Sequence, residues 1–126
     1  MGEKQGQPNN ARLIAPNEHG VYQPTETLAL LNPRPGWKGG PLAEIDLIEL
    51  PDGWRSAIGA MLASSGRGEP LTARPPAYAT REDAIQGGID KLRRWLATSN
   101  EAQAPVVGRW LDTLIPDQPD LFGVAA

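Results

Sequence analysis

The sequence contains no cysteine and a single histidine, His19, and each shortage excludes a class of chemistry. Without cysteine there are no disulfides, no thiolate nucleophile and no cysteine-bound zinc. One histidine on a Pro/Asn/Gly turn cannot form a His-based dyad, a catalytic triad or a zinc cluster. Gly66-Arg67-Gly68 has neither Walker spacing nor a following lysine, so it is not a nucleotide-binding loop. We therefore expect no enzymatic activity, no metal and no cofactor.

Long apolar segments are also missing. No run of 18 apolar residues is present, so no segment is expected to span a membrane. The first ten residues lack the apolar centre of a secretory signal. The net charge of −3 disfavours indiscriminate binding of nucleic acid by the whole chain. These features predict a cytoplasmic protein.

Glycine and proline, by contrast, are abundant, with 14 and 13 residues in a chain of 126. This excess predicts irregular segments around one smaller folded unit. We expect a disordered tail over 1–10, an irregular extension over 11–40, a domain over 41–115 and a tail over 116–126. Within the extension, residues 25–31 are expected to form one or two helical turns capped by Thr25.

Residues 43–62 have the pattern of a β-hairpin. Ala43–Leu50 alternates between apolar and polar residues, and Pro51-Asp52-Gly53 is a tight-turn signal. Trp54–Leu62 fits a strand with period two and a helix with period 3.6 nearly equally well. The hairpin signal, and Gly59 in the middle of the segment, favour a strand. Leu71–Ala73 is expected to form a third short strand.

The segment after Pro76 predicts an amphipathic helix. Thr80 is placed as its N-cap, with Asp83 positioned to return the capping hydrogen bond. Apolar residues repeat along one face, namely Ile85, Ile89, Leu92 and Leu96. Gly87-Gly88 lowers helix propensity, which suggests that the helix backbone lies close against a sheet. A second helix is expected from about Ala104 or Pro105 to Ile115. The predicted class is α+β: a small antiparallel sheet of two or three strands packed on one long helix, plus a C-terminal helix.

This order of elements over residues 43–97 resembles the arm-type DNA-binding domain of phage integrases and, more loosely, the double-stranded-RNA-binding domain. Arg81-Glu82-Asp83 stands where the RNA-binding family has lysines, which counts against RNA. The resemblance to the integrase domain implies that the sheet inserts arginines into the major groove, and the matching residues are Arg55, Arg67 and Arg74. Segment 54–97 has seven cations and four anions, which gives it a net charge of +3.

The C-terminal residues carry a second resemblance. Gln118, Asp120, Leu121 and Phe122 match, at the same spacing, the peptide with which many bacterial proteins bind the DNA polymerase III sliding clamp. Pro119 departs from the leucine usual at its position. The resemblance implies a bacterial source or a bacterial mobile element, and a tail that inserts Leu121 and Phe122 into an apolar pocket. The alternative is a tail that packs these side chains against its own domain.

Other candidate contact residues are Trp37, in a Pro/Gly loop, and Trp95, just off the apolar stripe of its helix. Glu44 and Asp46 share one strand face and offer oxygen ligands for Mg²⁺, although such a pair is more typical of a solvated face. The sequence thus predicts a non-enzymatic interaction protein that binds the sliding clamp. Two alternatives stay open: a sheet-based DNA-binding module, and a phage- or plasmid-borne inhibitor of a host protein.

Overall fold

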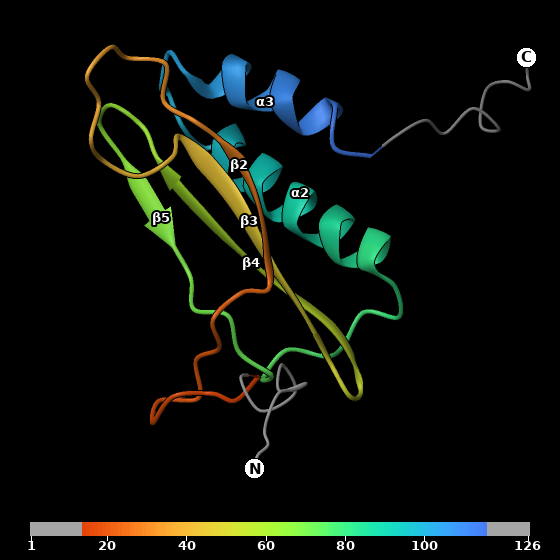
Figure 1. Cartoon of the computed structure of the whole chain (residues 1–126). Helices are drawn as coiled ribbons and strands as arrows, with labels where there is room; N and C mark the ends of the chain where they lie inside the picture. The colour runs from red at the N-terminus through yellow and green to blue at the C-terminus, as the bar shows by residue number, and fades with distance from the viewer. Residues whose placement is uncertain (1–13, 116–126) are drawn as a thin grey trace, which may run out of the picture.

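The computed structural model describes residues 14–115, which form a four-stranded antiparallel sheet with two helices on one side of it (Figure 1). The strands follow the order β2-β3-β4-β5, so each strand pairs with the one that precedes it in the chain. Their bounds are β2 Glu26–Leu30, β3 Ala43–Leu50, β4 Gly53–Met61 and β5 Gly66–Gly68, and the helices are α2 Arg81–Ala97 and α3 Ala104–Asp112. The α+β class is confirmed, with four strands rather than two or three.

Strand β2 replaces the helical turns that were expected over residues 25–31. It pairs with β3 from Glu26 opposite Leu47 to Leu30 opposite Ala43. Its residues alternate between half-buried and exposed, which is the pattern of a strand with one side against a core. The short Thr-Leu-Ala-Leu segment has no strong local preference, so pairing with β3 decides its conformation. The sheet therefore begins at residue 26, before the boundary that was expected at residue 41.

The hairpin between β3 and β4 confirms the strand interpretation of residues 54–62. Pro51 and Asp52 form the turn, and Gly53 follows with φ of +134°, a backbone conformation that L side chains rarely adopt. A Cβ at Gly53 would also lie 2.7 Å from the Cβ of Ala77. Both conditions require glycine at this position.

The prediction of a third strand at Leu71–Ala73 is wrong. The strand after β4 is β5, Gly66–Gly68, which precedes the predicted segment in the chain. Leu71 is buried instead, and its carbonyl accepts a 2.8 Å hydrogen bond from the backbone N–H of Tyr22. The apolar character of Leu71 therefore reflects burial against the sheet, and its segment contributes an isolated bridge rather than a strand.

The main core lies between the sheet and the two helices, and we call it the helix-side core. Helix α2 begins as predicted, because the Thr80 side chain accepts a 3.0 Å hydrogen bond from the Asp83 N–H. Gly88 allows α2 to approach β3 closely, since a Cβ there would lie 2.8 Å from Cγ2 of Ile45. This confirms that the helix backbone packs tightly on the sheet. The core is formed by Leu42, Ala43, Ile45, Leu47, Ile58, Leu62, Ala84, Ile85, Ile89, Leu92, Leu96, Val107 and Leu111.

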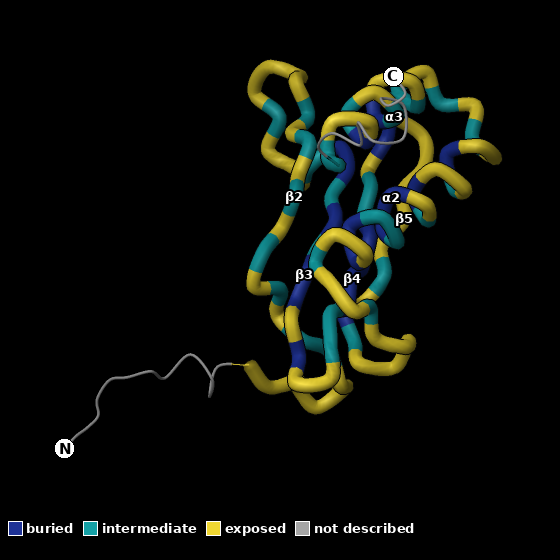
Figure 2. The backbone as a smooth tube through the Cα atoms, turned by 90° about the vertical axis from the view of Figure 1, so that its right-hand side faces the viewer, coloured by how far each residue is buried: buried dark blue, intermediate teal, exposed yellow. Residues whose placement is uncertain are grey.

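A second, smaller core covers the opposite face of the sheet near the hairpin turn. It contains Ile48, Leu50, Ala57 and Leu71, with Tyr22 packed against them. The chain before β2 and the chain after β5 cross this face together, joined by a bridge between Val21 and Thr72. The buried segments of β3 and β4 in Figure 2 therefore have cover on both sides at this end. Neither helix of residues 14–115 has the length and hydropathy needed to cross a bilayer.

Candidate functional site

The sheet face opposite α2 is covered only at its hairpin end. Farther from the turn it carries Thr27 and Ala29 on β2, Glu44 and Asp46 on β3, and Met61 on β4. We call these five residues the open face. Thr27 pairs with Asp46 and Ala29 with Glu44 across the two strands, and directly opposed residues share a face. Thr27, Ala29 and Met61 are exposed, and the two carboxylates are half-buried.

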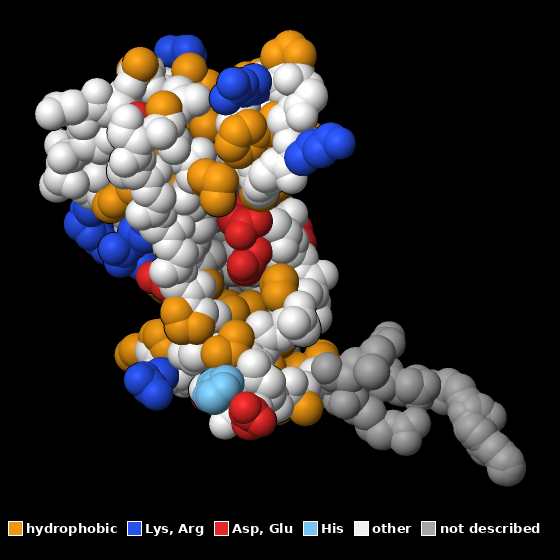
Figure 3. Space-filling view, turned by 90° about the vertical axis from the view of Figure 1, so that its left-hand side faces the viewer, with side chains coloured by type: hydrophobic (Ala, Val, Ile, Leu, Met, Phe, Trp, Pro, Cys, Tyr) orange, Lys and Arg blue, Asp and Glu red, His pale blue; other side chains and the backbone are white. Residues whose placement is uncertain are grey.

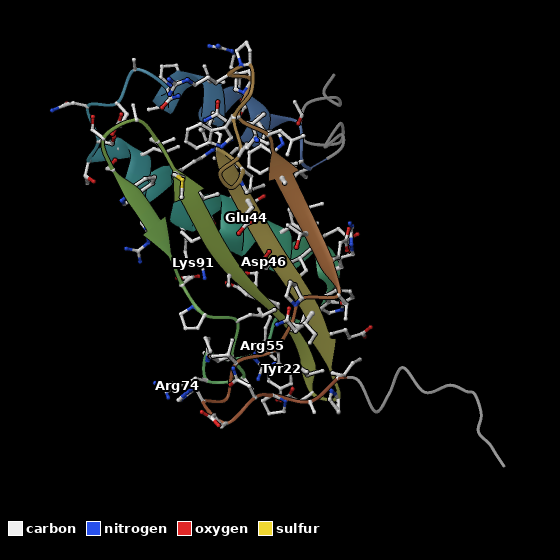
Figure 4. All side chains as sticks on the ribbon, turned by 60° about the vertical axis from the view of Figure 1, so that its left-hand side comes forward. Tyr22, Glu44, Asp46, Arg55, Arg74 and Lys91 are labelled. Carbon is white, nitrogen blue, oxygen red and sulfur yellow. The ribbon has the colours of Figure 1, made fainter. Side chains whose placement is uncertain are left out.

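The open face lies in a hollow between two blocks of loops. Figure 3 shows acidic side chains at the middle of this side of the molecule, with hydrophobic side chains above and below them. Figure 4 shows Glu44 and Asp46 projecting from β3 on this face, while Tyr22 and Arg55 lie nearer the hairpin turn. The hollow combines charge with exposed apolar surface, because Met61 is 47% exposed.

The two carboxylates are close to each other but differ in their contacts. Asp46 accepts a 2.8 Å hydrogen bond from the hydroxyl of Thr27. Glu44 lies over Gly59, where a Cβ would come within 3.0 Å of its Oε2. Burial, and secondly the negative charge of Asp46, raise the pKa of Glu44. Within residues 14–115 no lysine or arginine forms an ion pair with either carboxylate.

The raised pKa of Glu44 predicts a pH dependence of stability. The folded protein binds this proton more tightly than the unfolded chain does, so ionisation of Glu44 lowers stability as the pH rises above about 4.5. We expect Glu44→Gln to be more stable than the wild type at pH 7, with the difference vanishing near pH 3. Urea unfolding midpoints measured across this range test the expectation.

Glu26 provides a control of opposite sign. Its hydrogen bonds with the Arg81 guanidinium lower its pKa, so its contribution to stability is present above the ordinary pKa and is lost as the pH falls. Glu26→Gln should therefore be less stable than the wild type at pH 7. If both variants shift stability in the same direction, the proposed environment of Glu44 is incorrect.

Arg55, expected to insert into DNA, is instead a buried structural residue. Only 4% of it is exposed. Its Nε donates to the Pro75 carbonyl at 2.8 Å, one Nη donates to the Ala73 carbonyl at 3.1 Å, and both Nη groups bind the Asp52 carboxylate. Asp52 is in the hairpin turn and residues 73–75 follow the second core, so the guanidinium joins these two segments. Its donors face inward and are not available to a nucleic acid.

The other two arginines of that predicted set are exposed but point to different regions. Arg67 on β5 pairs with Ala60, which packs on the helix-side core, so Arg67 lies on the α2 side of the sheet. Arg74 lines a shallow hollow with His19 and Tyr22 at the hairpin end of the molecule. The structure therefore does not assemble the three arginines into one surface on the sheet.

Trp37 and Trp95 border two separate hollows. The Trp37 indole N–H donates to the Gly40 carbonyl at 2.8 Å, and the Arg34 guanidinium lies 6.0 Å from the centre of its ring. Trp37 shares its hollow with Met61, so it lies beside the open face. Trp95 packs on the helix-side core and lines a hollow whose other residues are Ser64, Ser65, Thr98, Ser99, Asn100 and Glu101.

The clamp-like peptide, with Gln118, Asp120, Leu121 and Phe122, lies outside the described residues. Comparison of the chain with protein-family models, curated proteins and solved structures finds no match.

Sequence reasoning missed two parts of the open face, Thr27 and Ala29, because residues 25–31 were expected to be helical. The alternation of Glu26, Leu28 and Leu30 with smaller residues was the available signal. Glu44 and Asp46 were considered only as ligands for a cation or as part of a solvated strand face. Among residues 14–115, no group of three or more histidine, aspartate or glutamate side chains is arranged to hold a metal.

Proposed function

We propose that this chain is a non-enzymatic interaction protein that binds another protein through its open face and its C-terminal tail. The observation that supports it is the uncovered half of the sheet. There, the exposed apolar side chains of Ala29 and Met61 share a face with two carboxylates that have no cationic partner among residues 14–115. Charged side chains beside exposed apolar surface can attract a partner of opposite charge and fix its orientation.

The charge of the open face favours a protein over DNA. A duplex presents one phosphate charge about every 1.7 Å along its axis, and Glu44 and Asp46 would repel it. A protein surface with lysine or arginine would instead neutralise the two carboxylates. The inward orientation of Arg55 removes one of the three side chains on which a sheet-based reading of DNA depends.

The bacterial sliding clamp is the partner that the tail indicates. Leu121 and Phe122 supply an aliphatic and an aromatic anchor for one apolar pocket, and Gln118 supplies a hydrogen-bonding group. Pro119 favours an extended backbone, which reduces the entropy lost on binding. In this proposal the tail is the main anchor and the open face makes a second contact with the same partner.

Binding to purified bacterial sliding clamp tests both contacts in the full-length chain. We expect micromolar affinity for the wild type, corresponding to about −8 kcal/mol. Leu121→Ala with Phe122→Ala should abolish binding, because it removes both anchors. Glu44→Lys with Asp46→Lys should weaken binding by about tenfold, close to the lower end of the range measured for interfacial charge pairs.

The matched control is Glu18→Lys with Asp90→Lys, which makes the same change of net charge at exposed positions away from the open face. This control should bind like the wild type, and circular dichroism should show that all variants are folded. Equal binding by the tail variant and the wild type would exclude the clamp as the partner. Equal effects of the open-face variant and its control would exclude the open face from the contact.

A further inference from the structure

The two edges of the sheet are built differently. Strand β2 forms one edge over five residues, with no proline, lysine or arginine among them. Figure 2 shows β2 at the rim of the sheet. Soluble proteins commonly block such an edge with charge, proline, a bulge or a covering segment, because its unpaired backbone groups can pair with another strand.

The opposite edge is protected. Strand β5 has only three residues, Gly66–Gly68, and carries the charge of Arg67. Beyond it, Glu69 closes the outer side of β4, since its N–H donates to the Ile58 carbonyl at 3.1 Å and its carboxylate accepts from the Ile58 N–H at 3.2 Å. Nearer the turn, Trp54 and Tyr78 exchange two backbone hydrogen bonds of 2.9 Å. A second chain therefore finds few unpaired backbone groups at this edge.

Strand β2 is suited to pair with a second copy of itself. An antiparallel pair with its two-fold axis at Leu28 places Leu28 opposite Leu28, Thr27 opposite Ala29 and Glu26 opposite Leu30. No like charges meet in this register. Glu26, the one charged residue of the strand, is already bonded to Arg81 of its own chain.

We propose that two copies of this chain associate through β2 to form one continuous eight-stranded antiparallel sheet. Leu31, which is 73% exposed directly after β2, would lie opposite Thr25 of the second copy and lose part of its exposure. A two-fold contact of this kind is self-complementary and closed. Because the β5 edge is protected, the assembly ends at two copies. This proposal does not depend on the identity of the partner of the open face.

The oligomeric state of the full-length protein in solution tests the proposal. Sedimentation equilibrium should show a concentration-dependent species with twice the 13.5 kDa mass of one chain. Hydrogen exchange of the β2 amides should slow as the dimer forms. A monomer at millimolar concentration overturns the proposal.

Two matched variants then identify the interface. Thr27→Lys with Ala29→Lys sets lysine opposite lysine across the two-fold axis, whereas Thr27→Lys with Ala29→Glu sets lysine opposite glutamate. We expect the first variant to weaken dimerisation on the order of tenfold and the second to retain it.

Within one chain, the variant that weakens the dimer is expected to be the more stable of the two. A folding defect therefore cannot explain the expected result. A lysine at position 29 lies opposite Glu44 and stabilises the monomer, while a glutamate there repels Glu44. A weaker dimer in the Lys/Lys variant alone therefore cannot come from a less stable chain. Equal dimerisation of both variants would place the interface elsewhere and overturn the proposal.

Discussion

Replacing Gly88 by leucine is expected to lower the free energy of unfolding by about 3 kcal/mol, at the upper end of the usual cost of overpacking a core. Even a Cβ at this position would lie 2.8 Å from Cγ2 and 3.1 Å from Cδ1 of Ile45. Ile45 is fully buried between α2 and the sheet, so it has no free space into which to move. Chemical denaturation followed by far-UV circular dichroism measures the change.

Gly108 is the matched control, because it too lies inside a helix. A Cβ there meets no atom within 4 Å, so Gly108→Ala should gain most of the helix propensity of alanine, up to about 1 kcal/mol. Adding a side chain at a helical glycine is thus expected to lower stability in α2 and to raise it in α3. In the pair Gly88→Ala and Ile45→Ala, the double variant should lose less stability than the sum of the single variants. A Gly88→Leu protein as stable as the wild type would contradict the close contact between α2 and β3.

Replacing Arg55 by methionine is expected to cost about 3 kcal/mol, because it removes several hydrogen bonds made by a charged group whose own side chain is buried. The guanidinium supplies the hydrogen bonds to the carbonyls of Ala73 and Pro75 and also binds Asp52. Methionine retains much of the apolar length of the side chain, so the loss measures the polar contacts. Urea unfolding at neutral pH is the appropriate assay.

Arg55→Lys should restore little of this stability, since one ammonium group cannot reproduce the planar set of donors. Arg67→Met and Arg74→Met are the controls, because both side chains are exposed. Their effects should stay within about 0.5 kcal/mol, as is usual for surface substitutions. If all three methionine variants have the same small effect, Arg55 is not the buried connector described above.

Local signals in the sequence were sufficient for the hairpin and for α2. The turn at Pro51-Asp52-Gly53 and the N-cap at Thr80 depend on residues that are neighbours in the chain. Gly87-Gly88 even indicated the close approach of helix and sheet. In each case the deciding contact lies within a few residues or follows from an apolar period.

The elements that were missed depend on distant partners. Strand β2 forms because β3 lies beside it, and β5 contains only Gly66-Arg67-Gly68, which has no apolar pattern. The orientation of Arg55 depends on carbonyls 18 and 20 residues farther along the chain. For the open face, the alternation of Glu44 and Asp46 was visible in the sequence. The sequence did not show which half of the sheet Tyr22 and Leu71 cover, because tertiary packing decides it.

The strand order β2-β3-β4-β5 has a consequence for how quickly this chain reaches its native state. Neighbouring strands are joined by two residues between β3 and β4, four between β4 and β5, and twelve between β2 and β3. Closing short loops costs little entropy, and low contact order is associated with rapid folding. The main refolding phase after dilution from urea should therefore be fast, and only chains that hold non-native isomers of the 13 prolines should refold more slowly.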